Sequence, residues 1–426
     1  MLDIKFIREN TDLVKQSVKN RGADIDVEEL IKLDEERRRS LVEVQQLRHK
    51  HNKTNDEIAG LLKEKKNAKD LISNMKMLSQ EIAVLDKEVE QISKKVADFM
   101  TLIPNIPHND IPIGGPKANK VVKTWGEHRK FAFKPRNHME LAELLDIISF
   151  GLASKITGRG FACYFGQGAR LERALINFML DLHTKKHGYT EVFPPFLVNR
   201  ASMTGTGQLP KLEADMYALK DDDLFLVPTA EVPVTNLLRN EVLREEDLPV
   251  CYTAYTACFR REAGSYGQKT QGLIRVHQFD KVEMVKFVRP ESSFDELESL
   301  LKDAEEVIQL LELPYRIVML ATGDISFAAA KCYDIELFAS GSDMDLEVSS
   351  CSNFTDFQAR RMNIRYKPKD SKRPVYVHTL NGSGVALARL VVAILENFQN
   401  EDGSVSLPKA LVPYMDGVEV LKPASA

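Results

Sequence analysis

Apolar residues recur at alternating steps of four and three through the second half of a long N-terminal stretch that contains no proline. They are Leu71, Met75, Leu78, Ile82, Leu85, Val89, Ile92, Val96 and Phe99. This repeat, sustained over about four heptads, is typical of a coiled-coil seam. The first half keeps the spacing, with several polar members, at Leu33, Arg37, Ser40, Val44, Leu47, His51, Thr54, Ile58 and Leu61. The pattern therefore predicts two long helices.

Local signals place the ends of these helices. Asp26 and Glu29 have the spacing of a capping box, which marks the start of the first long helix after a short helical segment that ends near Gly22. The break between the two helices, residues 63–70, is short, so we expect them to fold back as an antiparallel hairpin. With the preceding segment they form a predicted N-terminal domain, residues 1–101.

The helical pattern ends in a stretch rich in proline and glycine, LIPNIPHNDIPIGGPKANK, which begins at Leu102. We interpret residues 102–123 as a linker. From residue 124 to residue 426, strand-like runs, helical patterns and turn clusters alternate, as in a mixed domain of helices and strands. Within it, Ala169–Val198 is predicted to be an amphipathic helix stopped by Gly188 and followed by a strand that prolines interrupt.

Composition narrows the class of protein. The chain has 426 residues, 43% hydrophobic and 28% charged, which suits a large globular core and a second module. No apolar run approaches the roughly 20 residues of a membrane helix, and the charged start is unlike a signal peptide, so a cytoplasmic location away from membranes is expected. The cysteines lack disulfide or metal-ligand spacing, so no zinc is expected. The formal charge of −4 excludes a uniformly basic nucleic-acid binder but not a local basic patch.

Candidate chemistry is densest in Phe259–Glu283, FRREAGSYGQKTQGLIRVHQFDKVE. We predict a strand from Leu273 onward, in which Arg275, Phe279 and Glu283 share one face because side chains two apart do so. An arginine, an aromatic ring and a carboxylate in a row could meet a phosphate, a flat base and an amine. The alternative is a hairpin with a solvated charged face, since alternation is common in half-exposed sheets.

Two neighbouring segments could add to such a site. The strand before the polar turn is expected to end with Arg260 and Glu262 on a common face, by the same rule of alternation. Thr229, Ala230 and Glu231 stand between two prolines, where a loop could hold a hydroxyl and a carboxylate in fixed directions. Taken alone, that loop is more simply explained as a turn with a solvated glutamate.

Two later segments carry further candidates. Glu347 and Ser350, on a strand that precedes a helix, offer the hard oxygen ligands that suit Mg²⁺. The same residues could instead belong to a strand end that caps the helix. Arg389 lies about one turn into an otherwise apolar helix, after a predicted Gly-Ser-Gly turn at residues 382–384. An unpaired charge would be costly there, so Arg389 requires an anionic partner.

Taken in order, these segments resemble the motifs of the class II aminoacyl-tRNA synthetases. Ala169–Val198 is similar to motif 1, Phe259–Glu283 to motif 2 and Val375–Asn397 to motif 3, and GLIRVHQFDKVEM resembles the seryl-tRNA synthetases in particular. The helical hairpin resembles the N-terminal arm of that family, so the likeness covers essentially the whole chain. It implies an α+β fold: a mostly antiparallel sheet flanked by helices in a catalytic domain, residues 124–426, with an antiparallel coiled-coil arm.

The same likeness implies an enzyme that activates L-serine with ATP to seryl-adenylate and transfers serine to the 3′ end of serine tRNA. By carry-over, the catalytic residues are Arg260, Arg275 and Arg389. The ATP-binding residues are Arg260, Arg261, Glu262, Val276, Phe279, Glu347, Val348, Ser349, Ser350 and Arg389, with Mg²⁺ on Glu347 and Ser350. The serine pocket comprises Thr229, Ala230, Glu231, Arg260, Glu283, Asn381 and Ser383. Which of its two glutamates meets the substrate ammonium stays open.

The implied partners are serine tRNA, held by its long variable arm, and a second copy of the chain bound through motif 1. Selenocysteine tRNA is a further candidate. The basic tip that would contact RNA comprises Arg48, Lys50, Lys53, Lys63, Lys65, Lys66 and Lys69. A synthetase-like ligase with a different acceptor should lack the long arm, a coiled-coil scaffold leaves the arginines unexplained, and the Thr-Ala-Glu loop argues against threonine specificity.

Overall fold

The computed structural model describes residues 1–263 and 272–424. The chain forms two compact units: Leu2–Pro104, which is helical, and Asn105–Ala426 together with Met1. The division lies just after the last long helix, inside the stretch rich in proline that was interpreted as a linker. Within the described part of the chain, no helix combines the length and apolar character that crossing a bilayer requires.

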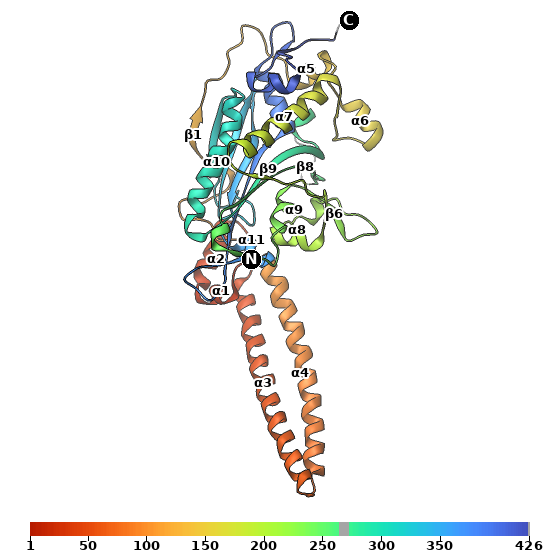
Figure 1. Cartoon of the computed structure of the whole chain (residues 1–426), viewed down its shortest axis with the longest axis vertical. Helices are drawn as coiled ribbons and strands as arrows, with labels where there is room; N and C mark the ends of the chain where they lie inside the picture. The colour runs from red at the N-terminus through yellow and green to blue at the C-terminus, as the bar shows by residue number, and fades with distance from the viewer. Residues whose placement is uncertain (264–271, 425–426) are drawn as a thin grey trace. The chain divides into compact units, whose positions relative to one another are not determined.

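The helical unit consists of α1 (Ile4–Glu9), α2 (Thr11–Asn20), α3 (Val27–Lys63) and α4 (Lys69–Leu102). The two long helices pack against each other and run antiparallel, as predicted (Figure 1). Asp26 starts α3 because its carboxylate accepts hydrogen bonds from the backbone N–H groups of Glu28, at 2.9 Å, and Glu29, at 3.3 Å.

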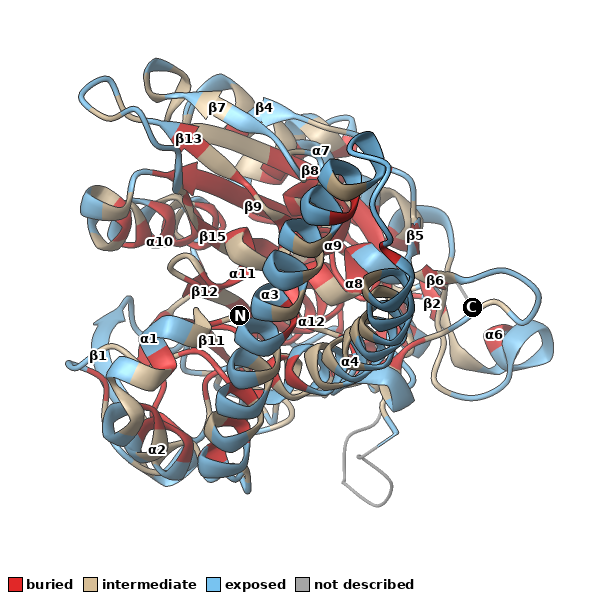
Figure 2. Ribbon diagram, turned by 90° about the horizontal axis from the view of Figure 1, so that it is seen from below, coloured by how far each residue is buried: buried red, intermediate tan, exposed pale blue. Residues whose placement is uncertain are grey.

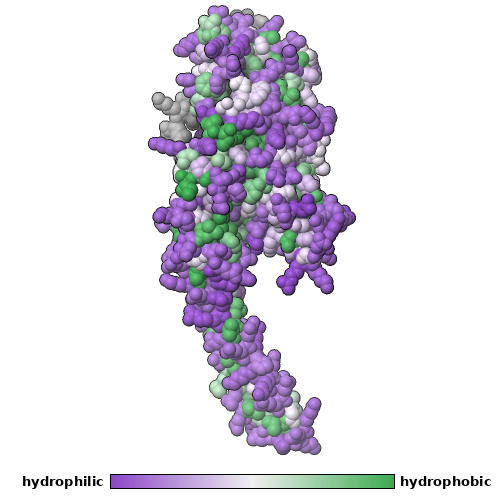
Figure 3. All heavy atoms as spheres, turned by 90° about the vertical axis from the view of Figure 1, so that its left-hand side faces the viewer, coloured by the Kyte–Doolittle hydropathy of each residue, from purple (hydrophilic) through white to green (hydrophobic). Residues whose placement is uncertain are grey.

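The coiled-coil seam lies where the heptad pattern placed it. Every predicted seam position in both helices is buried or partly buried, with Val44, Ile58 and Val96 buried, and most positions between them are exposed. The surface of the hairpin is mainly hydrophilic in the view of Figure 3. Arg48 donates to both carboxylate oxygens of Asp86, at 2.9 and 2.8 Å, and so ties α3 to α4.

The second unit is built on an eight-stranded sheet with the order β1-β10-β11-β12-β15-β9-β8-β4. Neighbouring strands are antiparallel except for β4 and β8. The strands are β1 (Lys120–Trp125), β4 (Thr190–Glu191), β8 (Val250–Phe259), β9 (Gln278–Val288), β10 (Tyr315–Met319), β11 (Lys331–Ala339), β12 (Met344–Asn353) and β15 (His378–Ala386). The predicted, mostly antiparallel α+β fold is confirmed.

Helices pack on both faces of this sheet. α10 packs on β12 and β15, whereas α9 packs on β9 and α11 on β15. The helices are α5 (His138–Leu144), α6 (Phe150–Thr157), α7 (Gly166–Lys185), α8 (Arg200–Thr206), α9 (Glu231–Asn236), α10 (Ser293–Leu310), α11 (Phe357–Met362) and α12 (Leu387–Asn397). The shorter strands are β2 (Ile148–Ser149), β3 (Cys163–Tyr164), β5 (Leu197–Asn199), β6 (Leu224–Leu226), β7 (Val242–Arg244), β13 (Arg365–Lys367), β14 (Val375–Tyr376), β16 (Val405–Ser406) and β17 (Val420–Leu421).

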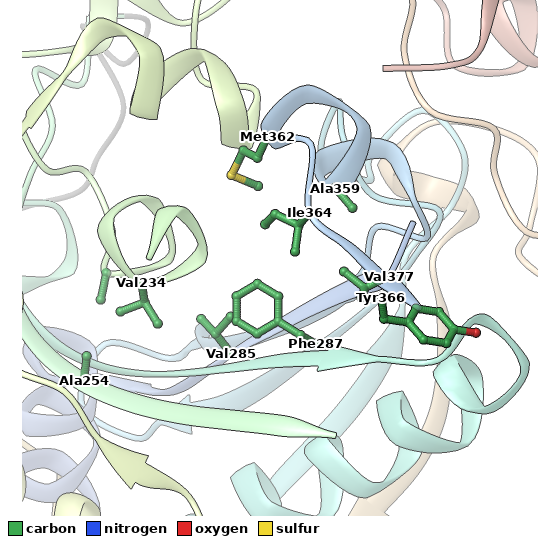
Figure 4. Packing of buried hydrophobic residues seen from close by; sticks show 10 residues of the cluster. Val234, Ala254, Val285, Phe287, Ala359, Met362, Ile364, Tyr366 and Val377 are labelled. Atoms are coloured by element: carbon green, nitrogen blue, oxygen red, sulfur yellow. The ribbon is translucent and has the colours of Figure 1, made fainter. Parts of the chain in front are cut away.

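Strand β9 lies inside the sheet, and most of it is buried (Figure 2). Its Val285 and Phe287 belong to a hydrophobic cluster with residues of α9 and α11 (Figure 4). On the opposite face, Lys286 donates to Glu296 of α10 at 2.9 Å. Alternation therefore puts the odd-numbered residues of β9 on the side of α9 and α11, and the even-numbered residues on the side of α10.

The predicted strand from Leu273 begins too early. Residues Gly272–Ile274 form a short 3₁₀ helix, and β9 starts only at Gln278. The backbone N–H of Leu273 donates to a ring nitrogen of His138, at 3.3 Å, instead of to a neighbouring strand. Part of the preceding polar turn lies outside the described residues.

The strand before the turn ends earlier than predicted, at Phe259. Arg260 and Glu262 therefore follow β8 rather than belong to it, and Glu262 has a left-handed backbone with φ of 51°. The rule of alternation does not apply to either residue. Only the backbone N–H of Arg260 continues the pairing, by donating to the carbonyl of His277 at 2.9 Å.

The prediction of a turn at the Gly-Ser-Gly segment is wrong: the segment is part of strand β15. A Cβ atom at Gly382 would stand 2.2 Å from Cδ2 of Leu300 in α10. Glycine is needed at this position because a helix packs closely on the strand, rather than because the chain reverses direction. Two other predicted segments have the expected order of elements: α7, Gly188 with φ of 75° and then β4, and β12 followed by α11.

Candidate active site

Five segments that carry predicted site residues meet, together with residues 206–212 and 326–328, around one pocket with a volume of about 340 Å³. Most of the predicted site residues line it: Thr229, Glu231, Arg260, Glu262, Arg275, Val276, Phe279, Glu283, Glu347, Val348, Ser349, Ser350, Asn381, Ser383 and Arg389. Two do not. Ala230 is buried in the hydrophobic cluster of Figure 4, and Arg261 is exposed, with its backbone N–H donating to the carbonyl of Asp215 at 2.8 Å.

One end of the pocket is buried and strongly charged. Glu283 on β9 forms an ion pair with Lys281, two residues before it on the same face. Thr229 joins them: its hydroxyl accepts from Nζ of Lys281 at 2.9 Å and donates to Oε2 of Glu283 at 3.1 Å. The other carboxylate oxygen of Glu283 is buried and has no hydrogen-bond partner among the described residues. Such an atom is costly unless a ligand satisfies it.

A second buried carboxylate lies at the same end. Glu231, at the start of α9, accepts a hydrogen bond of 2.6 Å from the side-chain amide of Gln358 on α11. The carbonyl oxygen of that amide in turn accepts from the hydroxyl of Thr379, at 2.7 Å, which fixes its orientation. Burial, and then the charge of Glu283, raise the pKa of Glu231 to about 7. The pocket therefore favours a cation beside this carboxylate.

The other end of the pocket carries three arginines. Arg260 lies over the ring of Phe279, with its guanidinium carbon 5.3 Å from the ring centre. Arg275 donates to Glu262 at 2.9 Å. Arg389 completes the set.

Arg389, in the first turn of α12, finds the anionic partner that its position requires. The partner is Glu347: the Nη1 atom of Arg389 lies 3.6 Å from its carboxylate and 2.7 Å from its carbonyl oxygen. The Nε atom donates to the carbonyl of Ile274 at 3.2 Å. These contacts aim the guanidinium into the pocket.

Oxygen donors suited to Mg²⁺ stand on the same strand as Glu347. Its carboxylate is half-exposed, and Ser350 lines the pocket with it, its hydroxyl lying 3.0 Å from Sγ of Cys332. Asp334, behind them on β11, is buried, and burial followed by the charge of Glu347 raises its pKa well above the ordinary value. Within the described residues no group of three or more His, Cys, Asp or Glu side chains could hold a metal alone. This donor set fits Mg²⁺, which binds through one or two carboxylates plus substrate phosphates.

Lys281 and Gln358 line or support the pocket but were not predicted as site residues. Lys281 could have been found, because it alternates with Phe279 and Glu283 along β9. Gln358 left no signal, since its contact with Glu231 spans 127 positions of sequence. Only the fold brings it there.

Comparison with known proteins agrees with this architecture. The family profile of the seryl-tRNA synthetase N-terminal domain matches residues 1–107, and that of the tRNA synthetase class II core domain (G, H, P, S and T) matches residues 215–398. The serine–tRNA ligase of Carboxydothermus hydrogenoformans is 56% identical over 416 residues, which span 97% of this chain and 98% of that protein. The chain belongs to the seryl-tRNA synthetase family.

Solved structures of this family share the fold over the whole chain. The crystal structure of seryl-tRNA synthetase from Pyrococcus horikoshii complexed with ATP has a TM-score of 0.93 at 39% identity and covers 100% of both chains. The cytoplasmic serine–tRNA ligase of Naegleria fowleri, in complex with AMP, has a TM-score of 0.88 at 28% identity and covers 100% of this chain and 99% of its own. The predicted family is confirmed.

The substitution Glu231→Gln should change the pH dependence of stability. The pKa of Glu231 is raised from 4.5 to about 7, so the folded chain keeps a proton that the unfolded chain loses between these values. This stabilisation is complete below the unfolded pKa and is lost as pH rises through about 7. From pH 5 to pH 8 the variant should therefore gain about 2 to 3 kcal/mol in free energy of unfolding relative to the unchanged chain.

Urea unfolding of both proteins at the two pH values measures this difference. The exposed Glu241 supplies the matched control Glu241→Gln, which should leave the pH dependence as it is. If the free energy of unfolding of Glu231→Gln changed with pH by the same amount as that of the unchanged chain, the carboxyl group of Glu231 would not titrate near neutral pH.

Proposed function

We propose that the pocket of this chain makes seryl-adenylate from L-serine and ATP, and that the enzyme then esterifies the 3′ end of serine tRNA. The observation that supports these roles best is the polarity of the pocket: two buried carboxylates at one end and three arginines at the other. The chain is an ATP-dependent serine–tRNA ligase, an activity that follows from relatives more than half identical over nearly their whole length. The roles of individual residues are inferred from the geometry.

In the first step, a carboxylate oxygen of serine attacks the α-phosphorus of ATP in line. A new P–O bond forms while the bond to the β-phosphate oxygen breaks, and pyrophosphate leaves. A carboxylate is already a nucleophile at neutral pH, so catalysis rests on positioning and on neutralising charge. Arg260 would hold the α-phosphate, and Arg275 and Arg389 the departing phosphates, in exchange for their present carboxylate partners Glu262 and Glu347.

The nucleotide base would lie against Phe279, with Arg260 on the ring. Val276 and Glu262 would complete the base site, and the segment that includes Arg261, together with Val348 and Ser349, would contribute to nucleotide binding. Glu347 and Ser350 would hold Mg²⁺ together with ATP phosphates. When bound, the ion supplies positive charge that offsets the charge of the leaving pyrophosphate.

The serine ammonium would bind Glu231, and the serine hydroxyl would bind Glu283. The charge of Glu283 is already offset by Lys281, whereas the side-chain donor to Glu231 among the described residues is the neutral amide of Gln358. The unpartnered oxygen of Glu283 can then accept from a neutral hydroxyl. Thr229, beside Glu231, and Asn381 and Ser383, on the adjacent strand β15, would close the pocket, with Ala230 shaping the loop from behind.

In the second step, a ribose hydroxyl at the 3′ end of the tRNA attacks the carbonyl carbon of the adenylate and releases AMP. The basic residues near the tip of the α3–α4 hairpin would hold the RNA through its phosphates. Arg48, Lys50, Lys53, Lys63, Lys65, Lys66 and Lys69 are all exposed. Arg48 is engaged by Asp86 and Lys66 by Glu64, so the remaining lysines suit this role best. Selenocysteine tRNA would be bound in the same way.

The active enzyme would be a homodimer in the cytoplasm. The segment after α7 exposes 75% of Phe193, and the adjacent Pro194 and Pro195 line an open groove with Leu197. Apolar side chains concentrated where the edge strand β4 ends suit burial against a second copy.

Exchange of pyrophosphate into ATP should be strong with serine and weak with alanine, glycine or threonine when Mg²⁺ is present. Alanine and glycine leave the buried oxygen of Glu283 without a donor, which supports discrimination on the order of 10⁴. The assay uses the purified chain with each amino acid in parallel. Equal exchange with alanine and serine would refute the assignment of the hydroxyl to this pocket.

The variant Arg260→Ala should abolish exchange, with kcat lowered at least about 10²-fold, because a guanidinium that stabilises developing charge is lost. The molecular mass of the variant in solution should equal that of the unchanged chain, which would show that its oligomeric state is preserved. The exposed Arg289, just after β9 and outside the pocket lining, supplies the matched control Arg289→Ala, which should retain far more activity. Normal exchange by Arg260→Ala would remove this residue from the mechanism.

Reversal of charge near the tip of the hairpin, Lys53→Glu with Lys63→Glu and Lys65→Glu, should leave serine-dependent exchange intact and impair aminoacylation of tRNA. Each lost phosphate contact should lower the slope of log affinity against log salt by about one. The same three changes at Lys87, Lys94 and Lys95, farther along α4, form the control. A parallel loss of exchange and aminoacylation would contradict a separate RNA-binding role for the tip.

A further inference from the structure

Lys281 is a buried cation in the pocket that the reaction itself does not require. Its side chain is 7% exposed and lies among the residues that would bind the amino acid. It meets two acceptors, the carboxylate of Glu283 and the hydroxyl of Thr229 at 2.9 Å. Burying an ammonium group away from water costs several kcal/mol, so its presence here requires a function or a compensating interaction.

The charges at this end of the pocket make the role of Lys281 specific. Glu231 and Glu283 supply two negative charges, and Lys281 supplies one positive charge. Arg260, at the other end of the pocket, would be engaged by the α-phosphate in the proposed function. One negative charge therefore remains for the amino acid, which matches the single ammonium group of serine.

We propose that Lys281 is a specificity-determining residue whose ammonium group neutralises Glu283, so that the pocket accepts a neutral hydroxyl at the β-carbon and rejects a second cation there. The proposal rests on the proposed function and deepens it. Lys281 is a positioning residue, since it acts through Glu283 and Thr229 and need not touch the substrate.

The hydrogen bonds support this role. Lys281 and Thr229 both bind the same oxygen of Glu283, Oε2, and leave Oε1 as the buried atom without a partner. A hydroxyl satisfies that oxygen with one hydrogen bond and adds no charge. A second substrate ammonium would instead place two cations beside one carboxylate, which like-charge repulsion disfavours.

Removal of Lys281 should reverse the preference. In Lys281→Met the carboxylates of Glu231 and Glu283 would face the substrate without an internal cation. An amino acid with two ammonium groups would then match the pocket. The probe is 2,3-diaminopropionate, which has the carbon skeleton of serine and an amino group in place of the hydroxyl, so it would supply the missing cation in the same volume.

The experiment measures kcat/KM for ATP–pyrophosphate exchange with serine and with 2,3-diaminopropionate, on the unchanged chain and on Lys281→Met. The unchanged chain should prefer serine. In the variant the ratio of the two values should shift toward 2,3-diaminopropionate by about 10²-fold, the effect of truncating one partner of a buried charge pair.

Lys286→Met is the matched control. Lys286 lies on the same strand, is equally buried and is paired with Glu296, but it points to the opposite face and does not line the pocket. It should leave the substrate ratio unchanged even if it lowers the melting temperature. Proportional loss of both substrates in Lys281→Met, with the ratio preserved, would overturn the proposal and leave Lys281 a structural residue.

A second variant keeps the proposal testable if Lys281→Met fails to fold. The double substitution Lys281→Met with Glu283→Gln removes both charges and restores one net negative charge at this end of the pocket. It should prefer serine over 2,3-diaminopropionate again, and a preference for the diamine would refute the charge-matching role. If the unchanged chain failed to exchange with serine, the proposed function would be refuted instead. This measurement does not depend on the variants.

Discussion

The buried ion pair between Lys281 and Glu283 is the interaction on which the amino-acid end of the pocket depends. Moving two charges out of water costs several kcal/mol for each ion, so such a pair is tolerated only where the geometry is fixed and further hydrogen bonds exist. Strand β9 provides the fixed geometry, because it is held between β8 and β15 inside the sheet. Thr229 provides the further hydrogen bonds from a different segment, which ties the loop before α9 to the sheet.

The same face of β9 explains how a polar pocket can lie beside the hydrophobic core. Phe279, Lys281 and Glu283 occupy successive odd positions in the pocket, and the next two odd positions, Val285 and Phe287, enter the cluster with α9 and α11. One alternating strand thus carries the charged pair and the packing that immobilises it. At the nucleotide end, Arg275 and Arg389 are paired with Glu262 and Glu347 in more exposed positions, where exchange for phosphate is less costly.

Sequence patterns predicted those parts of the structure that depend on local periodicity. The heptad seam of the arm was predicted residue by residue, because burial in a two-helix hairpin follows the repeat alone. The set of candidate residues was largely predicted too, through resemblance. Strand ends were not: Arg275 was assigned to a strand that begins only at Gln278, since the backbone N–H of Leu273 donates to His138, 135 positions away. Gln358 and the close packing at Gly382 likewise depend on contacts that no local pattern contains.

In the proposed function, the two carboxylates of the pocket would also account for the selectivity for serine. Before substrate binds, burial disfavours the charged form of Glu231, and one oxygen of Glu283 has no donor among the described residues. The ammonium and the hydroxyl of serine would relieve both conditions together. Alanine would relieve only the first, so its complex would keep the free-energy cost of a buried, unpaired acceptor beside a charged group. Discrimination by a missing donor of this kind can reach about 10⁴, whereas a pocket that measured only volume would gain about 10- to 200-fold for one small group.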